Sequence, residues 1–492
     1  MYKKFDMKKL LIISVMIMSS MVSCHKELEP EIYNIISPTL FPKTEEDVKS
    51  LVTGVYSNIS TGTWGTLYSA GANSGVTVWP ELATDIMSCQ WGSYWIPLQN
   101  FGWNQNSGTV TETFNYYKGI SKATLAMDRI KDVPMTEAKK AAFMAELKCI
   151  RGWLAWVLYD LYGPVPVATL EILKNPLEEV ILERPDKKVM VDYMIGDLRE
   201  AANKLPVVAS EWGRFTKGTA LMVLLKVYMH EKDWANAEIV AREIKGLNQY
   251  ALLPDYASIF TYENQKNKEI IHSFSCTLES GNLWHAHVTP YNYVTNNPNI
   301  QKWGGFRMRW SFFETFEKTD KRLKVVISEY VGTDGVRYDR KNPGNSLDMG
   351  AVPMKYGEDP TQVGFYSSID MILFRYSDVL LSLAEAAANK NGSPTQECMD
   401  LINQVRTRAG LLNLNLADYA NLTSFNKMIL LERGHELFCE GGRRDDQIRH
   451  NTYIEFGKTI PGNQAADYKV LFPLPQSVIN EGKGKIKQNA GY

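Results

Sequence analysis

Apolar residues recur every three or four positions over much of this 492-residue chain, which is the spacing of one face of an α-helix. The first such stretch runs from Thr44 to about Ser60 and begins with Thr44-Glu45-Glu46-Asp47, typical of a helix N-terminus. A longer stretch begins at Thr136 and ends at Tyr162, because Gly163-Pro164 stops a helix. Further helices are predicted at about 111–130, 189–205, 216–230, 235–245, 378–389, 395–409 and 424–440. The pattern therefore predicts a mostly α-helical protein.

Two pairs of these helices are separated by only a few residues. In 219–244, small alanines alternate with large apolar residues, which is typical of a tetratricopeptide-like hairpin. The segment 376–409 repeats this arrangement, with Ala384-Glu385-Ala386 before the turn Asn391-Gly392-Ser393-Pro394. Two such hairpins favour a scaffold of stacked helix pairs.

Two long stretches between the helical blocks are rich in Gly, Asn, Pro and aromatic residues, at about 61–110 and 250–373. Loops of this length in a compact chain are usually functional. We therefore expect a single body over 41–492, with a helical scaffold at about 41–60, 111–249 and 374–492, and a ligand region in the two long stretches.

The aromatic residues of these stretches suit a sugar. An exposed indole can stack on the C–H face of a sugar ring while amides and carboxylates bind the hydroxyls. Trp91-Gly92-Ser93-Tyr94-Trp95 could form such a platform, and Trp284 and Trp303, with Asn282 and Asn292 nearby, could form the opposite wall. The predicted ligand-binding residues are Trp91, Tyr94, Trp95, Trp284, Trp303, Asp85 and Asn282. The alternative is that each tryptophan anchors a loop to the core.

The charge of the chain limits its partners. A formal net charge of -1 gives no field that would gather nucleic acid or acidic lipid, so neither is expected. Clustered cations in the aromatic stretches are few beyond Lys302, Arg307 and Arg309. A neutral ligand is therefore favoured over an acidic one.

The N-terminus predicts export. Four lysines precede the apolar run Leu10–Met18, which is too short to span a bilayer, and translation could start at Met1 or Met7. Met21-Val22-Ser23-Cys24 is similar to a lipoprotein box, so residues 1–23 are the expected signal peptide and Cys24 the expected acylated residue. Residues 24–40 then form a tether. The alternative is a plain secretory signal with an incidental cysteine.

Enzymatic chemistry has little support in the sequence. Glu81, Asp85 and Glu279 could serve a glycosidase, but their spacing selects no pair. His285-x-His287 would place two imidazoles on one side of a strand without a third ligand at useful spacing. The other cysteines, Cys89, Cys149, Cys276, Cys398 and Cys439, are far apart and are expected to be free thiols. We therefore expect no catalytic residues, metal or cofactor.

Several motifs in order along the chain resemble those of the SusD/RagB-like family of outer-membrane nutrient-binding lipoproteins. They are Arg151-Gly152-Trp153-Leu154-Ala155-Trp156, Phe374-Arg375-Tyr376-Ser377-Asp378-Val379-Leu380-Leu381, Ile402-Asn403-Gln404-Val405-Arg406-Thr407-Arg408-Ala409-Gly410, Glu432-Arg433-Gly434-His435-Glu436-Leu437, Glu440-Gly441-Gly442-Arg443-Arg444-Asp445-Asp446 and Leu471-Phe472-Pro473-Leu474-Pro475. Their charged residues are expected to tie helices together through ion pairs and not to form an active site. Two departures, Ser377-Asp378 and Arg444-Asp445-Asp446, are conservative.

The resemblance implies a tetratricopeptide-containing helical body that sits over a TonB-dependent, SusC-like outer-membrane transporter. It implies a lipid-anchored protein on the cell exterior that binds a glycan without turnover. A peptide ligand, as in a related branch of the family, a glycan-active enzyme and a pure scaffold remain alternatives.

Overall fold

The predicted helices are present, with most boundaries within a few residues of those expected. The computed structural model describes residues 41–59, 75–92 and 95–492, and Thr44–Tyr492 form one compact unit. The predicted signal peptide, Cys24, the tether and Tyr94 lie outside the described residues. The α-helices are α2 (Glu45–Tyr56), α3 (Trp95–Gln99), α4 (Gly108–Phe114), α5 (Tyr117–Arg129), α6 (Glu137–Tyr162), α7 (Leu170–Lys174), α8 (Lys187–Lys204), α9 (Lys217–His230), α10 (Trp234–Gly246), α11 (Trp284–Val288), α12 (Trp310–Phe313), α13 (Tyr376–Asn391), α14 (Gln396–Arg408), α15 (Leu422–Leu437), α16 (Arg443–Arg449), α17 (Tyr453–Thr459) and α18 (Gln476–Glu481).

Local capping explains several of these boundaries. The side chains of Thr44, Thr136, Thr216 and Thr395 each accept a hydrogen bond from the backbone N–H three residues later, at the starts of α2, α6, α9 and α14. The end of α6 falls at Gly163, which has φ +73° and accommodates a conformation that other residues rarely adopt. The helix ends that were expected from Thr136 and Gly163-Pro164 are confirmed.

The single helix predicted at 111–130 was wrong. The chain forms α4 and α5, joined at Asn115 and Tyr116, whose backbone N–H groups bond to carbonyls three residues back. This tighter 3₁₀ bonding interrupts the α-helical pattern although the apolar spacing continues through it. Periodicity alone does not reveal such a break.

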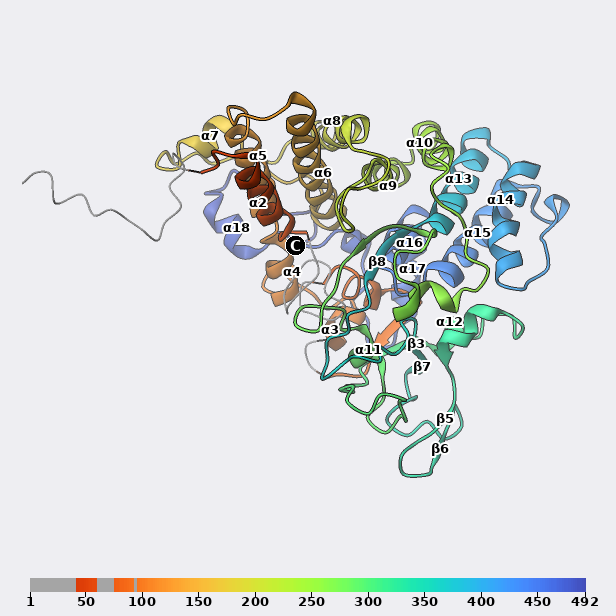
Figure 1. Ribbon diagram of the computed structural model, residues 1–492. Helices are drawn as coiled ribbons and strands as arrows, with labels where there is room; N and C mark the ends of the chain where they lie inside the picture. Colours follow the sequence, from red (N-terminus) through yellow and green to blue (C-terminus); the bar gives the residue numbers. More distant parts are fainter. Residues whose placement is uncertain (1–40, 60–74, 93–94) are drawn as a thin grey trace, which may run out of the picture. The chain divides into compact units, whose positions relative to one another are not determined.

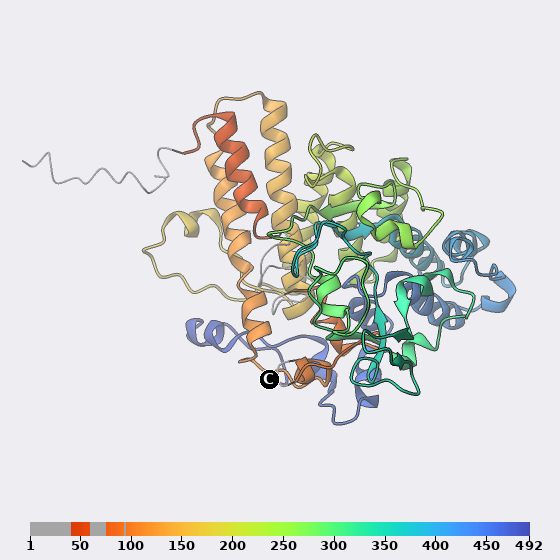
Figure 2. The same cartoon turned by 60° about the horizontal axis from the view of Figure 1, so that its bottom comes forward.

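The long helices pack one after another. Contacts link α5 to α6, α6 to α8, α8 to α9, α9 to α10, α10 to α13, and α13 to both α14 and α15. Figure 1 shows this row, with the segments that carry α11, α12, β3 and β5–β7 lying to one side of it, and Figure 2 shows α2, α5 and α6 running side by side. The predicted hairpins are α9–α10 and α13–α14. No helix in the described ranges is both long and apolar enough to cross a bilayer.

Short strands cross-link the two loop-rich stretches. The strands are β1 (Met87–Cys89), β2 (Ile270–Phe274), β3 (Phe306–Arg309), β4 (Val326–Ile327), β5 (Tyr330–Val331), β6 (Arg337–Tyr338), β7 (Gly350–Pro353) and β8 (Met371–Arg375). One sheet has the order β1-β3-β7-β4, and β2 pairs with β8. The antiparallel β1–β3 pairing places Met87 opposite Met308 and Cys89 opposite Phe306. Residues about 220 positions apart in sequence therefore lie together.

The motif charges tie helices together, as expected. The Arg406 guanidinium on α14 lies 2.9 Å from the Glu432 carboxylate on α15, and Arg433 on α15 lies 2.9 Å from Asp446 on α16. All four side chains are nine-tenths or more buried. The five cysteines of the described body are free, four of them buried and Cys276 partly exposed.

Candidate functional site

The β1–β3 pairing brings the two aromatic stretches together around Trp91. The Trp91 ring centroid lies 5.3 Å from Phe306 and 6.1 Å from Trp95, and Trp95 lies 5.3 Å from Phe306. The Trp91 indole N–H donates to the carbonyl of Trp303 at 3.3 Å. Gly305 lies under the Trp91 ring, where any side chain would collide with the indole. Trp91, Trp95 and Trp303 are therefore neighbours in the fold.

Trp303 continues this group towards a segment that the sequence did not single out. Its ring packs edge-on against His287 at 4.8 Å and lies 5.3 Å from Phe365, which lies 4.5 Å from Tyr366. The backbone N–H of Gln301 donates to the carbonyl of Gly364, and the N–H of Gly364 donates to the carbonyl of Asn299, so the two segments lie side by side. Trp91, Trp95, Trp303, Phe365 and Tyr366 are all partly exposed, and we call these five residues the aromatic surface.

Two of the predicted ligand residues are buried structural residues. Trp284 is 1% exposed, and its indole N–H donates to the carbonyl of Pro353 at 2.9 Å. Asn282 is also 1% exposed, accepts from the backbone N–H of Trp284, and exchanges backbone hydrogen bonds with Ser367. Both residues anchor α11 to the core, so neither presents a free face to a ligand in this structure.

The carboxylate of Asp85 is also engaged. Its two oxygens accept from Nε and Nη2 of Arg443 at 2.8 and 2.7 Å. Its neighbour Glu81 is fully buried, and its Oε1 accepts from the backbone N–H groups of Gly441 and Arg443. Burial raises the pKa of Glu81 to about 7. These two carboxylates hold the start of α16 against the first loop-rich stretch.

The expectation for His285 and His287 was wrong in its geometry. Both lie on the one-turn helix α11 rather than on a strand, and both are 1% exposed. His287 stacks on Phe306, and its Nδ1 lies 2.9 Å from the carbonyl of Leu283, whereas the His285 Nδ1 lies 3.1 Å from the hydroxyl of Thr289. Burial lowers the pKa of each imidazole to about 4, so both are neutral aromatic packing groups near pH 7.

The cations near the aromatic surface are bound by backbone carbonyls. Lys302 donates to the carbonyl of Tyr293 at 2.7 Å, and Arg307, which is fully buried, donates to the carbonyls of Val288 and Phe306. Burial lowers the pKa of Arg307 to about 10. The positive groups of this region therefore hold loops in place, and the surface itself is aromatic rather than basic.

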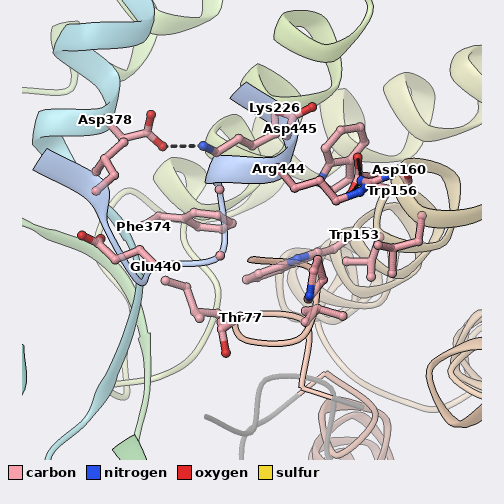
Figure 3. Close-up of a pocket in the computed structure, with 18 of the residues that line it drawn as sticks. Thr77, Trp153, Trp156, Asp160, Lys226, Phe374, Asp378, Glu440, Arg444 and Asp445 are labelled. Atoms are coloured by element: carbon pink, nitrogen blue, oxygen red, sulfur yellow. Dashed lines mark hydrogen bonds and ion pairs between the residues drawn. The ribbon is translucent and has the colours of Figure 1, made fainter. Parts of the chain in front are cut away.

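A separate interior cavity of about 110 Å³ lies among α6, α9, α13 and the chain before α16 (Figure 3). Trp153, Trp156 and Phe374 form its aromatic walls, and Lys226 donates to Asp378 at 2.6 Å across one side. Its volume is well below the roughly 300 Å³ at which pockets for drug-sized ligands begin. It does not suit an oligosaccharide.

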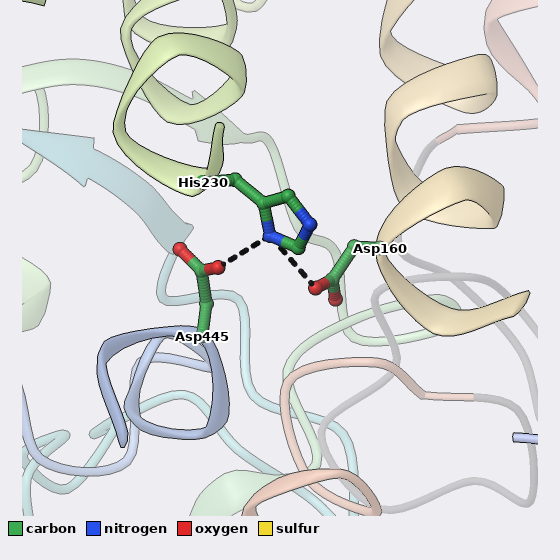
Figure 4. A group of neighbouring side chains, drawn as sticks. All are labelled: Asp160, His230 and Asp445. Carbon is green, nitrogen blue, oxygen red and sulfur yellow. Dashed lines mark hydrogen bonds and ion pairs between the residues drawn. The ribbon is translucent and has the colours of Figure 1, made fainter. Parts of the chain in front are cut away.

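Next to this cavity, Asp160, His230 and Asp445 converge from α6, α9 and α16 (Figure 4). The His230 Nδ1 lies 2.8 Å from Asp445 and 3.7 Å from Asp160. Arg444 donates to both oxygens of Asp160 at 3.0 Å, and Arg449 lies 3.3 Å from Asp445. Arginines thus already supply the positive charge that a metal would bring, and the group is an ion network between helices.

Comparison with known proteins covers nearly the whole chain. The profile described as "SusD family" matches residues 246–492, and the profile described as "Starch-binding associating with outer membrane" matches residues 36–229. "SusD-like protein P25" of Formosa agariphila is 25% identical over 94% of this chain and 95% of its own length. "Starch-binding protein SusD" of Bacteroides thetaiotaomicron is 22% identical over 73% of this chain and 74% of its own length.

Solved structures share the fold. A structure named "Laminarin binding SusD-like protein" superposes with a TM-score of 0.75 at 22% identity, covering 92% of this chain and 100% of its own. "Surface glycan-binding protein A" of Bacteroides thetaiotaomicron in complex with laminarihexaose gives 0.73 at 20% identity, covering 91% and 100%. The family profile alone spans half of the chain and includes the C-terminal motifs and the helices that carry them. The chain therefore belongs to the SusD family.

Proposed function

We propose that this protein is a non-catalytic lipoprotein of the cell surface that captures a glycan on the aromatic surface and delivers it to a TonB-dependent, SusC-like outer-membrane transporter. The observation that carries the proposal is the grouping of Trp91, Trp95 and Trp303 with Phe365 and Tyr366 as partly exposed rings. These rings come from both loop-rich stretches.

The chemistry of the aromatic surface suits an uncharged sugar chain. Rings that keep part of a face exposed can stack on the C–H faces of successive sugar units. Because Trp91, Trp303 and Phe365 are held by neighbouring rings and by β1–β3 pairing, little side-chain freedom is lost on binding. The nearby cations are occupied by carbonyls, which favours a neutral glycan over an acidic one.

The relatives support the same role. Proteins of this fold are named for binding starch or laminarin, and one profile is described as associating with the outer membrane. Outer-membrane attachment would follow from acylation of Cys24. Membership of the SusD family supports a SusC-like transporter as the partner.

The test is isothermal titration of the soluble body with laminarin, starch and a panel of other polysaccharides. We expect one glycan to bind saturably without reducing-sugar release, and Trp303→Ala to weaken that binding. Trp234→Ala is a matched control, because Trp234 is a half-buried tryptophan at the start of α10, in the helical row. Release of sugar by the wild type would favour an enzyme instead.

A peptide ligand remains the alternative within the family. It predicts no glycan binding, together with saturable binding of a peptide mixture that Trp303→Ala weakens. Glycan binding that is equal in wild type and Trp303→Ala would refute the placement of the site on the aromatic surface.

A further inference from the structure

A surface cavity of about 240 Å³ lies between the α8–α9 loop and the chain that leads into β2. None of the residues that line it belongs to the aromatic surface, and Figure 1 shows α8 and α9 in the helical row, apart from α11 and β3. The side chains that matter here are those of Trp212, Arg214, Lys266, Lys268 and His272. The volume is below the roughly 300–1,000 Å³ of pockets for drug-sized ligands and suits one sugar unit.

The indole of Trp212 forms a fixed and partly exposed wall of this cavity. Its residue is 39% exposed, and its N–H donates to Oδ2 of Asp370 at 2.7 Å. Asp370 is itself held, because its carboxylate also accepts from the backbone N–H of Cys276 at 3.2 Å. A large indole that is anchored at its polar edge and keeps part of its surface exposed is pre-organised for stacking.

Two lysines add positive charge to the lining of this cavity. The Lys266 ammonium lies 5.8 Å from the Trp212 ring centroid, and Lys268 follows two residues later on the same rim. Both lysines are exposed, and neither forms a direct ion pair with a carboxylate in the part of the chain that the structure describes. The Lys266 charge does act on the Asp370 carboxylate, where it opposes the rise in pKa that burial causes. Among the described residues that line the cavity, no side chain is acidic.

The other basic groups of the cavity carry no free charge. Arg214 lies 2.6 Å from the carboxylate of Glu146 and 3.3 Å from that of Glu211. Burial lowers the pKa of His272 to about 3, so its imidazole is neutral near pH 7. The excess positive charge is therefore that of the two exposed lysines that line the cavity, of which Lys266 lies beside the indole.

We propose that this cavity is a second ligand site, which takes a sugar unit that bears a carboxylate. The C–H face of the sugar ring stacks on Trp212, and the carboxylate binds Lys266 and Lys268. An aromatic face in a cavity lined by two exposed lysines discriminates between charged and uncharged sugars, in contrast to the aromatic surface, whose cations are occupied by carbonyls. The two sites are therefore expected to select different units of a mixed glycan, or different glycans.

The test is calorimetric titration of the soluble body with trimers of galacturonate and of mannuronate at millimolar concentration. Their fully methyl-esterified forms are the matched uncharged ligands, because they keep the rings and linkages. We expect at least one acidic trimer to bind, its ester to bind about tenfold more weakly or not at all, and the affinity to fall as salt rises. Absence of binding by both acids, or equal binding of acid and ester, would overturn the proposal.

Variants locate the site. Lys266→Gln and Trp212→Ala are each expected to weaken binding of the acidic trimer about tenfold, whereas Lys427→Gln, an exposed lysine on α15, leaves it unchanged. Trp212→Phe keeps a stacking ring without the Asp370 hydrogen bond and separates loss of stacking from local misfolding. Trp303→Ala should not affect this binding. If Trp303→Ala abolishes it and Lys266→Gln does not, the acid binds at the aromatic surface and the second site does not exist.

Discussion

The substitution Glu436→Gln tests whether buried charge pairing holds the C-terminal helices together. The Glu436 carboxylate accepts from Arg375 and Arg408 through Oε1 and lies 3.3 Å from Arg322 through Oε2. It belongs to a network whose buried members are five cations and five carboxylates; the exposed Glu317 also pairs with Arg406, at 3.0 Å. The buried members are Arg322, Arg375, Arg406, Arg408, Lys355, Asp320, Glu269, Glu432, Glu436 and Glu440. The substitution leaves the buried part of this network with one uncompensated positive charge.

The expected cost follows from burial. Glu436 and Arg375 are fully buried, and removal of one partner from a buried ion pair typically costs about 3–5 kcal/mol. Glutamine retains one acceptor oxygen but turns an amide N–H₂ towards guanidinium N–H donors, so we expect a loss near the upper end of that range. Water has little access to the uncompensated arginine charge, because Arg322, Arg375 and Arg408 are at most 3% exposed.

The assay is urea unfolding of wild type and variant, with the shift in midpoint converted to free energy. Glu455→Gln is the control, because Glu455 pairs with Lys458 at 3.1 Å on the surface, where such pairs contribute about 0–1 kcal/mol. A Glu436→Gln loss below about 1 kcal/mol, similar to that of the control, would refute the reasoning.

The same variant has a defined pH dependence. Burial alone would raise the pKa of Glu436, but Arg408, Arg375 and Arg322 outweigh burial and hold that pKa well below its usual range. A carboxyl with a lowered folded-state pKa stabilises the fold above the unfolded value of about 4.3, and this stabilisation is lost as the pH falls through the folded-state pKa. The advantage of wild type over Glu436→Gln should therefore be full at pH 6 and decrease below about pH 4.

Three further predictions follow from other parts of the chain. Trp284→Ala should destabilise the protein by about 3–5 kcal/mol in urea unfolding, because it leaves a cavity in the core. Trp303→Ala should mainly lower glycan affinity. Equal stability losses in the two variants would contradict this distinction. Burial lowers the pKa of His230, but Asp445 and its neighbours outweigh this effect and raise it, so stabilisation by His230 is present below about pH 6.5 and lost as the pH rises through the folded-state pKa. His230→Gln should therefore cost more in urea midpoint at pH 6 than at pH 9, and an equal cost at both would count against protonation. Cys24→Ala should move the protein from the membrane fraction to the soluble fraction of cells, and retention in the membrane would exclude Cys24 as the anchor.

The fold was predictable because its helices carry their own signals. Threonine caps such as Thr136, the stop at Gly163 and the alternation of alanines with large residues in α9–α10 are local features of the sequence. The short strands β1 and β3 were not predictable from the same patterns. Each has three or four residues, and each is stabilised by a partner more than 200 positions away rather than by its own periodicity.

The sequence could not tell which of the predicted ligand residues are exposed and which are buried, for a physical reason. Trp284 and Trp303 lie in the same loop-rich stretch, and each has glycine and polar residues within three positions, so these neighbours do not tell the two apart. What distinguishes them is α11. Its single turn is packed on all sides, so Trp284 enters the core, and the chain that returns after α11 brings Trp303 back beside His287 and Phe365 at the rim. Phe365 and Tyr366 carry no motif, and their part in the aromatic surface depends on Gly364 pairing with Gln301, a contact between segments that the sequence does not connect. In such a loop region, the identity of a residue indicates the chemistry that is available, and only the tertiary contacts decide which rings a ligand can reach.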